Sequence, residues 1–411
     1  MRNPGPLLRD GHQIRLLQGG QEYFPTLIEA IGHARSEVRL ETYIFDFTAA
    51  GAEVAEALVH AAQRGVTVWL VVDGVGTGAL PARWQERFDE AGVQWRVYSP
   101  LGALGLLIPS RWRRLHRKLC VIDGRLAFCG GINILDDFHD PQHGKLDRPR
   151  LDFAVSASGA LVQQAQETTA QLWWRIQAVR NVRQRNFPQA FSSFRAGGLH
   201  LPWTGPDQEP AGAGRIVAKA GLLLRDNLLH RSQIEKAYRK AIGSARSEII
   251  IANAYFVPGR KLRQALVHAA RRGVRVRLLL QGRYEYFMQY HAARPVYGEL
   301  LQAGVEIYEY TASFLHAKVA VIDANGDRPW ATVGSSNLDP LSLLLAREAN
   351  VVVQDAPFAG ALRDRLVQAM QQDSRRVAPA QYANRPLRQR VLERMALGVM
   401  RLLLFITGNR Y

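Results

Sequence analysis

Along the first hundred residues the hydrophobic pattern alternates between helical and strand-like spacing. Apolar residues recur at helical spacing over Phe24–Ala34, and a β-rich segment follows at Val38–Phe45. The same alternation then predicts a helix over Ala52–Arg64, a strand over Val66–Val72, a helix over Pro81–Ala91 and a strand over Val93–Tyr98. Strands that alternate with helices predict βαβ units on a largely parallel sheet, with helices on both faces.

This pattern occurs twice, because the second half of the chain repeats stretches of the first in the same order. Three matches carry this conclusion: 57–66 with 265–274, 34–37 with 245–248, and 91–93 with 303–305. Their constant order and nearly constant offset indicate an internal duplication. We therefore expect an α/β fold of two pseudo-symmetric halves, each a mostly parallel sheet flanked by helices.

Composition places the boundaries of these halves. Residues 178–213 contain four prolines and several glycines and are basic, which is typical of a linker. We expect the first half at 1–177 and the second at 214–372. Residues 373–411 are basic and then apolar, and they lie outside the repeat as a C-terminal tail.

The charge of the chain is unusual for a globular protein of 411 residues. Its 47% hydrophobic and 22% charged residues are an ordinary balance for a protein with a core, but the formal net charge is +17. Such an excess attracts polyanions, which means nucleic acid or an anionic lipid surface. Charge alone does not choose between the two.

The sequence predicts a cytoplasmic protein without a membrane span. The N-terminus lacks an apolar core of signal-peptide length, and no uninterrupted run approaches the ~20 apolar residues of a spanning helix. Two cysteines are present, Cys120 and Cys129, on either side of a predicted hairpin. We expect two buried, reduced thiols there.

Each half holds one dense polar cluster in an apolar, β-like setting. The clusters are His116, Lys118 and Asp123 in the first half, and His316, Lys318 and Asp323 in the second. In each, the histidine and the lysine are two residues apart on a predicted strand, so that both project from one face. Asp123-Gly124 is a strong hairpin-turn signal, and return strands lead to Asn133 and Asn337.

These residue types fit the chemistry of a phosphodiester. Such a reaction needs a nucleophile, an acid for the leaving oxygen, and cations that neutralise the phosphate. One histidine and one lysine per half can supply these groups, with Asn133 and Asn337 as neutral donors. A lone histidine on a strand is usually a core or surface residue, but two intact copies at matching positions indicate a shared function. Because neither half has a complete set, we expect the active site where the halves meet.

The two clusters resemble the His-Lys-Asp signature of the phospholipase D superfamily, and the resemblance covers nearly the whole chain. The stretches Ile251–Phe256 and Gly334–Ser342 are similar to bacterial cardiolipin synthases, most of all to the B type. The resemblance implies phosphatidyl transfer between two phosphatidylglycerol molecules, giving cardiolipin and glycerol, with no cofactor. No metal is implied either, since Asp136, Asp137, His139 and His143 do not have the spacing of a closed metal site.

The resemblance also implies roles for individual residues. His116 would be the nucleophile and form a phosphatidyl-histidine intermediate, while His316 would protonate the leaving glycerol and deprotonate the incoming hydroxyl. Lys118, Lys318, Asn133, Asn337 and Ser335 would hold or support the phosphate. Asp152 and Glu348 match positions that orient the histidine rings in the family, although surface ion pairs are the alternative. We expect Asp123 and Asp323 to close the turns beside their motif strands.

Two departures from the family pattern concern the segments after the motifs. Gly131 stands where the pattern often has serine, so phosphate contacts there would come from the backbone. The second half has four extra residues between Asp323 and Gly334, including Pro329 and Trp330, which we interpret as a longer hairpin tip.

Three apolar stretches beside arginines favour lipid over nucleic acid. The first is a loop expected to dip into the membrane interface, with Leu104, Leu106, Leu107, Ile108 and Trp112 as its membrane-facing residues. The second is Trp173-Trp174 before the arginines of 180–185, and the third is the tail segment Met395–Ile406. A buried plug, core tryptophans and a docked helix are the respective alternatives.

The sequence therefore predicts a cardiolipin synthase bound peripherally to the cytoplasmic side of the inner membrane. Its substrate would be the anionic phospholipid phosphatidylglycerol, and no nucleic-acid partner is expected. A hydrolytic phospholipase D, or a phosphatidyltransferase with another alcohol acceptor, is the alternative within the same chemistry. A superfamily nuclease and a non-enzymatic protein that binds anionic membranes are the alternatives of a different class.

Overall fold

A computed structural model describes residues 8–100, 102, 112–140, 143–184, 186–196, 217–226, 232–283, 287–339, 346–383 and 385–406. The chain divides into two compact units. The N-terminal unit contains Leu8–Asp136 and Ala154–Leu222, and the C-terminal unit contains Asp137–Phe153 and the chain from Leu223 onward.

The sheet of the N-terminal unit has the strand order β10-β7-β6-β2-β3-β4. These strands are β2 (Glu37–Thr42), β3 (Thr67–Asp73), β4 (Gln94–Tyr98), β6 (Lys118–Ile122), β7 (Leu126–Gly130) and β10 (Phe153–Ser158). The pairs β2/β3 and β3/β4 are parallel, whereas β2/β6, β6/β7 and β7/β10 are antiparallel.

The C-terminal unit repeats this order with one added strand, β17-β16-β15-β12-β13-β14-β18. The strands are β12 (Glu248–Asn253), β13 (Arg275–Gln281), β14 (Glu306–Tyr310), β15 (Lys318–Ile322), β16 (Trp330–Gly334), β17 (Ala346–Gln354) and β18 (Ser374–Arg376). Again β12/β13 and β13/β14 are parallel, and the pairs that involve β15, β16 and β17 are antiparallel.

The expected α/β fold of two similar halves with helix-flanked sheets is therefore confirmed, but "mostly parallel" is wrong in detail. Each sheet is mixed. The reason is the motif hairpin, because strands joined by a short turn must run antiparallel, whereas parallel neighbours need a crossover connection. The predicted turn is present: Asp123 and Gly124 both have positive φ, 51° and 63°. In the second hairpin Trp330 already pairs with Ile322, so the longer tip ends before it.

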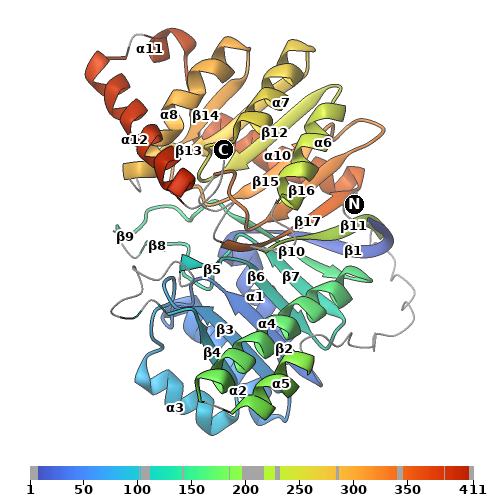
Figure 1. Ribbon diagram of the computed structural model, residues 1–411. Helices are drawn as coiled ribbons and strands as arrows, with labels where there is room; N and C mark the ends of the chain where they lie inside the picture. The colour runs from blue at the N-terminus through green and yellow to red at the C-terminus, as the bar shows by residue number, and fades with distance from the viewer. Residues whose placement is uncertain are drawn as a thin grey trace. The chain divides into compact units, whose positions relative to one another are not determined.

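Helices and short strands complete both units (Figure 1). The N-terminal unit adds α1 (Gly19–Gly32), α2 (Ala49–Gln63), α3 (Ala82–Ala91), α4 (Leu161–Arg183), α5 (Phe187–Ala196), β1 (Arg9–Gln18) and β5 (Arg114–Leu115). The first residues of β11 (Val217–Arg225) pair antiparallel with β1. The C-terminal unit adds β8 (His139–Asp140), β9 (Gly144–Lys145), α6 (Gln233–Ser244), α7 (Arg260–Arg271), α8 (Phe287–Gln302), α10 (Ala356–Gln372), α11 (Pro379–Ala383) and α12 (Leu387–Ile406).

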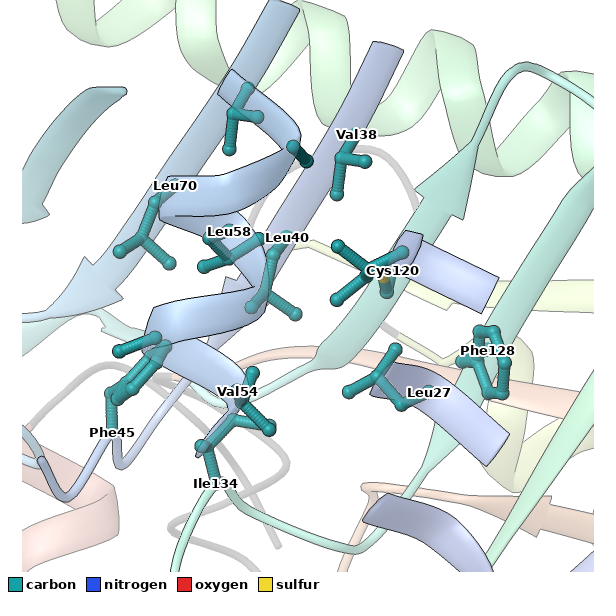
Figure 2. Packing of buried hydrophobic residues seen from close by; sticks show 14 of the residues in the cluster. Leu27, Val38, Leu40, Phe45, Val54, Leu58, Leu70, Cys120, Phe128 and Ile134 are labelled. Carbon is teal, nitrogen blue, oxygen red and sulfur yellow. The ribbon is translucent and has the colours of Figure 1, made fainter. Parts of the chain in front are cut away.

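The core of the N-terminal unit lies between its sheet and helices α1 to α3. Figure 2 shows Leu27 of α1 and Leu58 of α2 packed with Leu40 of β2. Burying one such side chain contributes about 1.5–3 kcal/mol to stability. Val71 faces the other side of the sheet, where it packs with Trp173 of α4, so helices cover both faces. Cys120 and Cys129 are buried free thiols, as predicted.

The compact units differ from the expected boundaries. Helix α4 continues through Ala178 to Arg183, and α5 follows within the segment expected to be a linker. Residues 161–183 contain neither Gly nor Pro, so nothing in this stretch ends the helix at 177. Asp137–Phe153 belongs to the C-terminal unit, and so do the described residues after Asp373. Among the helices in the described part of the chain, none has the length and apolar character needed to cross a bilayer.

Candidate active site

Each motif histidine lies just before the strand that carries its lysine. His116 follows β5 and His316 precedes β15, and both are half-buried, whereas Lys118 and Lys318 are almost completely buried. The Nζ of Lys118 donates to the backbone carbonyl of His116 at 2.8 Å. Lys318 makes the same bond to His316. The lysine therefore fixes the backbone of its own histidine and places a positive charge beside it.

The motif aspartates bind the tetrapeptide that is repeated in the sequence. One oxygen of Asp123 accepts from the backbone N–H of Ser36 at 2.8 Å and of Glu37 at 2.9 Å, and the other accepts from Arg35 at 2.9 Å. The Ser36 hydroxyl adds a further bond at 2.8 Å. Asp123 thus ties the motif hairpin to the start of β2, which supports a structural role for it.

Asp323 makes the equivalent set of hydrogen bonds in the C-terminal unit. Its carboxylate accepts from the backbone N–H groups of Arg246, Ser247 and Glu248 at 2.7, 2.8 and 2.9 Å. The Ala-Arg-Ser-Glu repeat is therefore the binding loop of the motif aspartate in both halves.

These contacts control the ionisation of both aspartates. Burial opposes the charged form of Asp123, but the hydrogen bonds from Glu37, Ser36 and Arg35 outweigh it, so the pKa of this carboxyl lies below its usual value. The pKa of Asp323 is lowered for the same reason. Both groups are charged at neutral pH and act as acceptors for the turn.

A buried carboxylate contacts the second motif histidine. Asp152 is 2% exposed, and its Oδ2 lies 2.6 Å from Nδ1 of His316. Its Oδ1 accepts from the backbone N–H of Phe153 at 2.8 Å. An ionised carboxylate only accepts, so beside an ionised Asp152 the proton lies on Nδ1 of His316, and in the neutral ring Nε2 keeps its lone pair. In this tautomer Nε2 can accept a proton.

The segment that supplies Asp152 is bound to the C-terminal unit on both sides of Leu315, directly before His316. The Leu151 N–H donates to the carbonyl of Phe314 at 2.9 Å, and the His316 N–H donates to the carbonyl of Leu151, also at 2.9 Å. The Ser313 hydroxyl donates to the carbonyl of Arg148 at 2.7 Å. These bonds fix the backbone of the carboxylate relative to that of the imidazole. No pattern in the residues predicts that this segment joins the C-terminal unit.

Glu348 lies at the matching position of the other half. Asn350 pairs with Gly334 as Ala154 pairs with Gly130, so Glu348 and Asp152 each stand two residues before the paired residue. Glu348 is fully buried and accepts a hydrogen bond from the Ser335 hydroxyl at 2.5 Å.

That contact defines what Ser335 can do. Its Oγ also accepts from the Ala349 N–H at 3.1 Å, and of the two acceptors within reach of its proton, Glu348 at 2.5 Å is nearer than the Ala349 carbonyl at 3.3 Å. The geometry therefore favours Ser335 as a support for the carboxylate. Gly131 stands at the corresponding place after β7 and has no hydroxyl to offer.

The two asparagines follow the return strands. Asn133 is 8% exposed and its Oδ1 accepts from the Ile44 N–H at 3.2 Å, so the side chain presents its NH₂ group as a donor. Asn337 is 2% exposed at the matching position. Beside it, the Leu338 N–H donates to Oδ1 of Asn253 at 3.1 Å.

Two residues that position the motifs were not predicted from the sequence. Oδ2 of Asp73, the last residue of β3, accepts from the Leu115 N–H at 2.7 Å. Oε1 of Gln281, the last residue of β13, accepts from the Leu315 N–H at 3.1 Å. Each side chain therefore holds the residue directly before a motif histidine. Their matching positions, at the last residues of the repeated strands β3 and β13, were the feature of the sequence that could have revealed them.

Asp73 is the more heavily bonded of these two residues. It also accepts from Arg114 at 3.1 Å and from the Val75 and Gly76 N–H groups at 2.8 and 3.2 Å. Burial raises the pKa of the Asp73 carboxyl, and these bonds oppose the rise. Tyr43, also unpredicted, lies edge-on to His116 with ring centroids 5.0 Å apart.

The predicted membrane-facing residues have different outcomes. Leu104, Leu106, Leu107 and Ile108 lie outside the described residues. Trp112 is half-buried, and its carbonyl accepts from Arg114 at 3.1 Å. The membrane interpretation of Trp173 is wrong, because this ring is buried in the core, where the Arg96 guanidinium stacks on it at 3.7 Å.

The acidic loop after the first motif forms local ion pairs. Asp140 accepts from Arg150 at 2.9 Å, and its other oxygen lies 2.9 Å from Nδ1 of His143. Within the described ranges, no group of three or more His, Cys, Asp or Glu side chains is arranged to hold a metal ion.

Comparison with known proteins identifies the family. Residues 27–142 and 238–370 match the family described as "Cardiolipin synthase, PLD-like domain". The two matched ranges cover more than half of the chain and contain both motifs. The chain belongs to this family.

Individual relatives agree with this assignment. The chain is 37% identical over 369 residues to cardiolipin synthase B of Escherichia coli K12, covering 87% of this chain and 80% of the relative. It is 38% identical to cardiolipin synthase B of Salmonella typhi, covering 90% and 83%. The crystal structure of phosphatidylserine synthase from Haemophilus influenzae shares the fold, with a TM-score of 0.67 at 13% identity, covering 96% of this chain and 95% of that one.

Proposed function

We propose that the protein is a cardiolipin synthase that transfers a phosphatidyl group from one phosphatidylglycerol to another and releases glycerol. One observation carries the proposal: the family match spans both halves, and each half keeps its His-x-Lys motif. The relatives named cardiolipin synthase B, 37–38% identical over most of the chain, support the choice of substrate.

In the first step, Nε2 of His116 attacks the phosphorus of phosphatidylglycerol. A P–N bond forms, the P–O bond to glycerol breaks, and its electron pair leaves with the glycerol oxygen. Protonated His316 gives that oxygen its proton, so that neutral glycerol departs. Asp152 supports this role, because its contact with Nδ1 stabilises the imidazolium before the transfer and fixes the ring afterwards.

In the second step, the terminal glycerol hydroxyl of another phosphatidylglycerol attacks the phosphatidyl-histidine. Neutral His316 accepts the hydroxyl proton through Nε2. A new P–O bond forms, the P–N bond breaks, and His116 returns to its starting state. The product is cardiolipin, and the net reaction consumes two phosphatidylglycerols and yields one glycerol.

Charge on the phosphate would be neutralised by Lys118 and Lys318, with Asn133 and Asn337 as neutral donors. The buried position of both lysines supports this, because a cation acts most strongly where water is excluded. Glu348 would orient a motif histidine as Asp152 does, with Ser335 holding it in place. Asp123 and Asp323 would contribute the hairpin geometry.

The substrate places the protein at a membrane. Phosphatidylglycerol is an anionic bilayer lipid, and the net charge of +17 favours binding to such a surface. We therefore assign a peripheral position on the cytoplasmic side of the inner membrane.

The test is an incubation of purified protein with phosphatidylglycerol vesicles, followed by mass spectrometry of the lipids. Wild type should form cardiolipin and free glycerol, and His116→Ala and His316→Ala should each lose about 10³-fold or more of the rate. His60→Ala and His268→Ala are matched controls, since these histidines are also repeated between the halves but lie exposed on α2 and α7. Both should keep wild-type activity.

Other products would indicate a different function. Phosphatidic acid without cardiolipin would indicate a hydrolase. Cleavage of single-stranded DNA in a parallel reaction, with no change in the lipids, would indicate a nuclease. Full cardiolipin synthesis by either motif variant would contradict the paired roles of the two histidines.

A further inference from the structure

Helix α12 carries a stripe of large apolar side chains on its exposed side. Its members and their exposed fractions are Leu387 (73%), Val391 (48%), Leu392 (38%), Met395 (62%) and Val399 (47%). Four of these residues are spaced by four, so successive side chains turn by only about 40° around the helix. Together the five residues form one continuous strip, the outer face of α12.

The opposite side of α12 is packed against the protein. Glu393 and Ala396 are 1% and 4% exposed, and α12 lies along α8. Arg385 donates to Glu393 at 2.5 Å, and Gln389 donates to its other oxygen at 3.0 Å. The helix therefore packs on the protein through its inner side. The apolar side chains of its outer face take no part in this packing.

The charges on α12 indicate which kind of partner the outer face binds. The helix contains Arg388, Arg390, Arg394 and Arg401, while its one acidic residue, Glu393, is buried and paired with Arg385. Arg388 and Arg394 are exposed beside the apolar strip. Apolar side chains flanked by arginines fit an anionic lipid surface, where the former enter the acyl boundary and the latter meet the phosphates.

Other occupants fit the same face less well. A second copy of α12 would bring arginines against arginines, and the like charges would oppose the contact. A nucleic acid would use the arginines but would gain nothing from five exposed aliphatic side chains. An anionic bilayer uses both features.

The course of α12 relates this face to the second motif. The preceding helix α11 contacts the middle of α8, where the Tyr382 hydroxyl donates to the carbonyl of Arg294 and the Tyr382 ring stacks with Tyr297. From there α12 runs back along α8 toward its first residues (Figure 1). Helix α8 begins shortly after Gln281, the residue that holds the backbone beside His316.

We propose that the outer face of α12 lies in the interfacial region of an anionic phospholipid bilayer and brings the His316 edge of the C-terminal unit toward its lipid substrate. The proposal rests on the proposed function and deepens it by naming the surface that meets the membrane.

The experiment compares the full-length protein with Val391→Ser/Met395→Ser and with Val217→Ser. Val217 is 56% exposed on β11, so its substitution removes an equally exposed apolar side chain elsewhere. Each protein is mixed with vesicles of phosphatidylcholine alone and with added phosphatidylglycerol, and binding is measured by flotation. Cardiolipin synthesis is measured on the same vesicles and on short-chain phosphatidylglycerol dispersed as monomers.

The double variant should bind the phosphatidylglycerol vesicles at least about tenfold more weakly, while Val217→Ser binds as wild type does. Its synthesis should fall on vesicles and stay unchanged on monomeric substrate. The proposal would be overturned if the double variant bound vesicles as well as wild type does. It would also be overturned if wild type were a dimer, the variant a monomer, and vesicle binding the same, because the face would then bind a second copy of the chain. The double variant could lose vesicle binding while no protein, wild type included, makes cardiolipin. That result would support the outer face of α12 as the membrane contact and reject the proposed reaction.

Discussion

The two motif regions share one scaffold but differ in the groups that support each histidine. In both, the motif aspartate binds an Arg-Ser-Glu backbone and the lysine binds the carbonyl of its own histidine. Before the histidine, however, the backbone is held by the carboxylate of Asp73 in one half and by the amide of Gln281 in the other. After the return strand, one half has Gly131 and the other has Ser335, which binds Glu348.

This comparison distinguishes the contacts that shape the backbone from those that surround each histidine. Hydrogen bonds that build the hairpin are the same in both halves because each histidine needs the same backbone. The supports around the histidines have diverged, which is expected if two copies of one motif perform different steps of one reaction. Substitutions at matching positions can therefore distinguish the shared scaffold from the divergent supports.

The largest effect is expected at Asp152. Asp152→Asn replaces the carboxylate on Nδ1 of His316 with an amide, which permits the wrong tautomer and removes the charge that stabilises the imidazolium. We expect kcat for cardiolipin synthesis to fall about 10²–10⁴-fold with little change in KM. Rates measured over a range of pH should also show an altered ionisation of the base. Asp147→Asn, an exposed acid in the same segment, is the control, and equal rates for the two variants would disprove the orienting role.

The next largest effect concerns the strand-end residues. Asp73→Ala removes the acceptor of Nη1 of Arg114 and of three backbone N–H groups, and we expect a loss of about 3–5 kcal/mol in the free energy of unfolding. Gln281→Ala removes one such bond, to Leu315, and should cost about 1–3 kcal/mol. Urea denaturation of both variants measures the difference. Equal losses would show that the charged support is no stronger than the neutral one.

The motif aspartates should give equal, smaller effects in the two halves. Asp123→Asn and Asp323→Asn should each lower the free energy of unfolding by about 1–3 kcal/mol at pH 7. Since their pKa values are lowered in the folded protein, this contribution is present above about pH 4, the usual range of an unfolded aspartate, and is lost as the pH falls through the folded pKa.

Urea denaturation at pH 7 and at pH 3 measures this dependence. The difference between wild type and either variant should shrink at the lower pH. A difference that is unchanged or larger in acid would contradict the assignment of the two carboxylates as charged acceptors.

The smallest effect is expected at Ser335. Ser335→Ala removes the hydroxyl that binds Glu348 but leaves the carboxylate in place, so synthesis should fall about tenfold or less and folding should change little. Steady-state rates and thermal denaturation measure both effects. Ser336→Ala is a neighbouring control, since within the described residues this buried hydroxyl donates to the carbonyl of Asn337 at 3.4 Å and does not contact Glu348. A loss as large as that of Asp152→Asn would mean that Ser335 contacts substrate.

Much of the fold follows from the sequence because it depends on local periodicity. The alternation of elements, the duplication and the Asp123-Gly124 turn are visible in the residues themselves. The share of antiparallel pairing was underestimated, because periodicity identifies strands but does not give their direction. The extent of α4 was missed because the prolines beyond it suggested a linker starting too early.

The candidate site was only partly predictable for a physical reason. Motif spacing identified the histidines, lysines and aspartates, and the family resemblance drew attention to Asp152. Long-range contacts have no local pattern, so the transfer of Asp137–Phe153 to the C-terminal unit could not be anticipated. The same holds for Asp73 and Gln281, whose function depends on a backbone N–H more than thirty residues away.

If the two histidines have different roles, only one of them forms the covalent intermediate, and trapping that intermediate tests this directly. Wild type and His316→Ala are mixed with phosphatidylglycerol, quenched within the first turnover and digested, and the peptides are analysed for a phosphatidyl adduct by mass spectrometry. We expect the adduct on His116 and none on His316. An adduct on His316 in the wild type would contradict this assignment of roles.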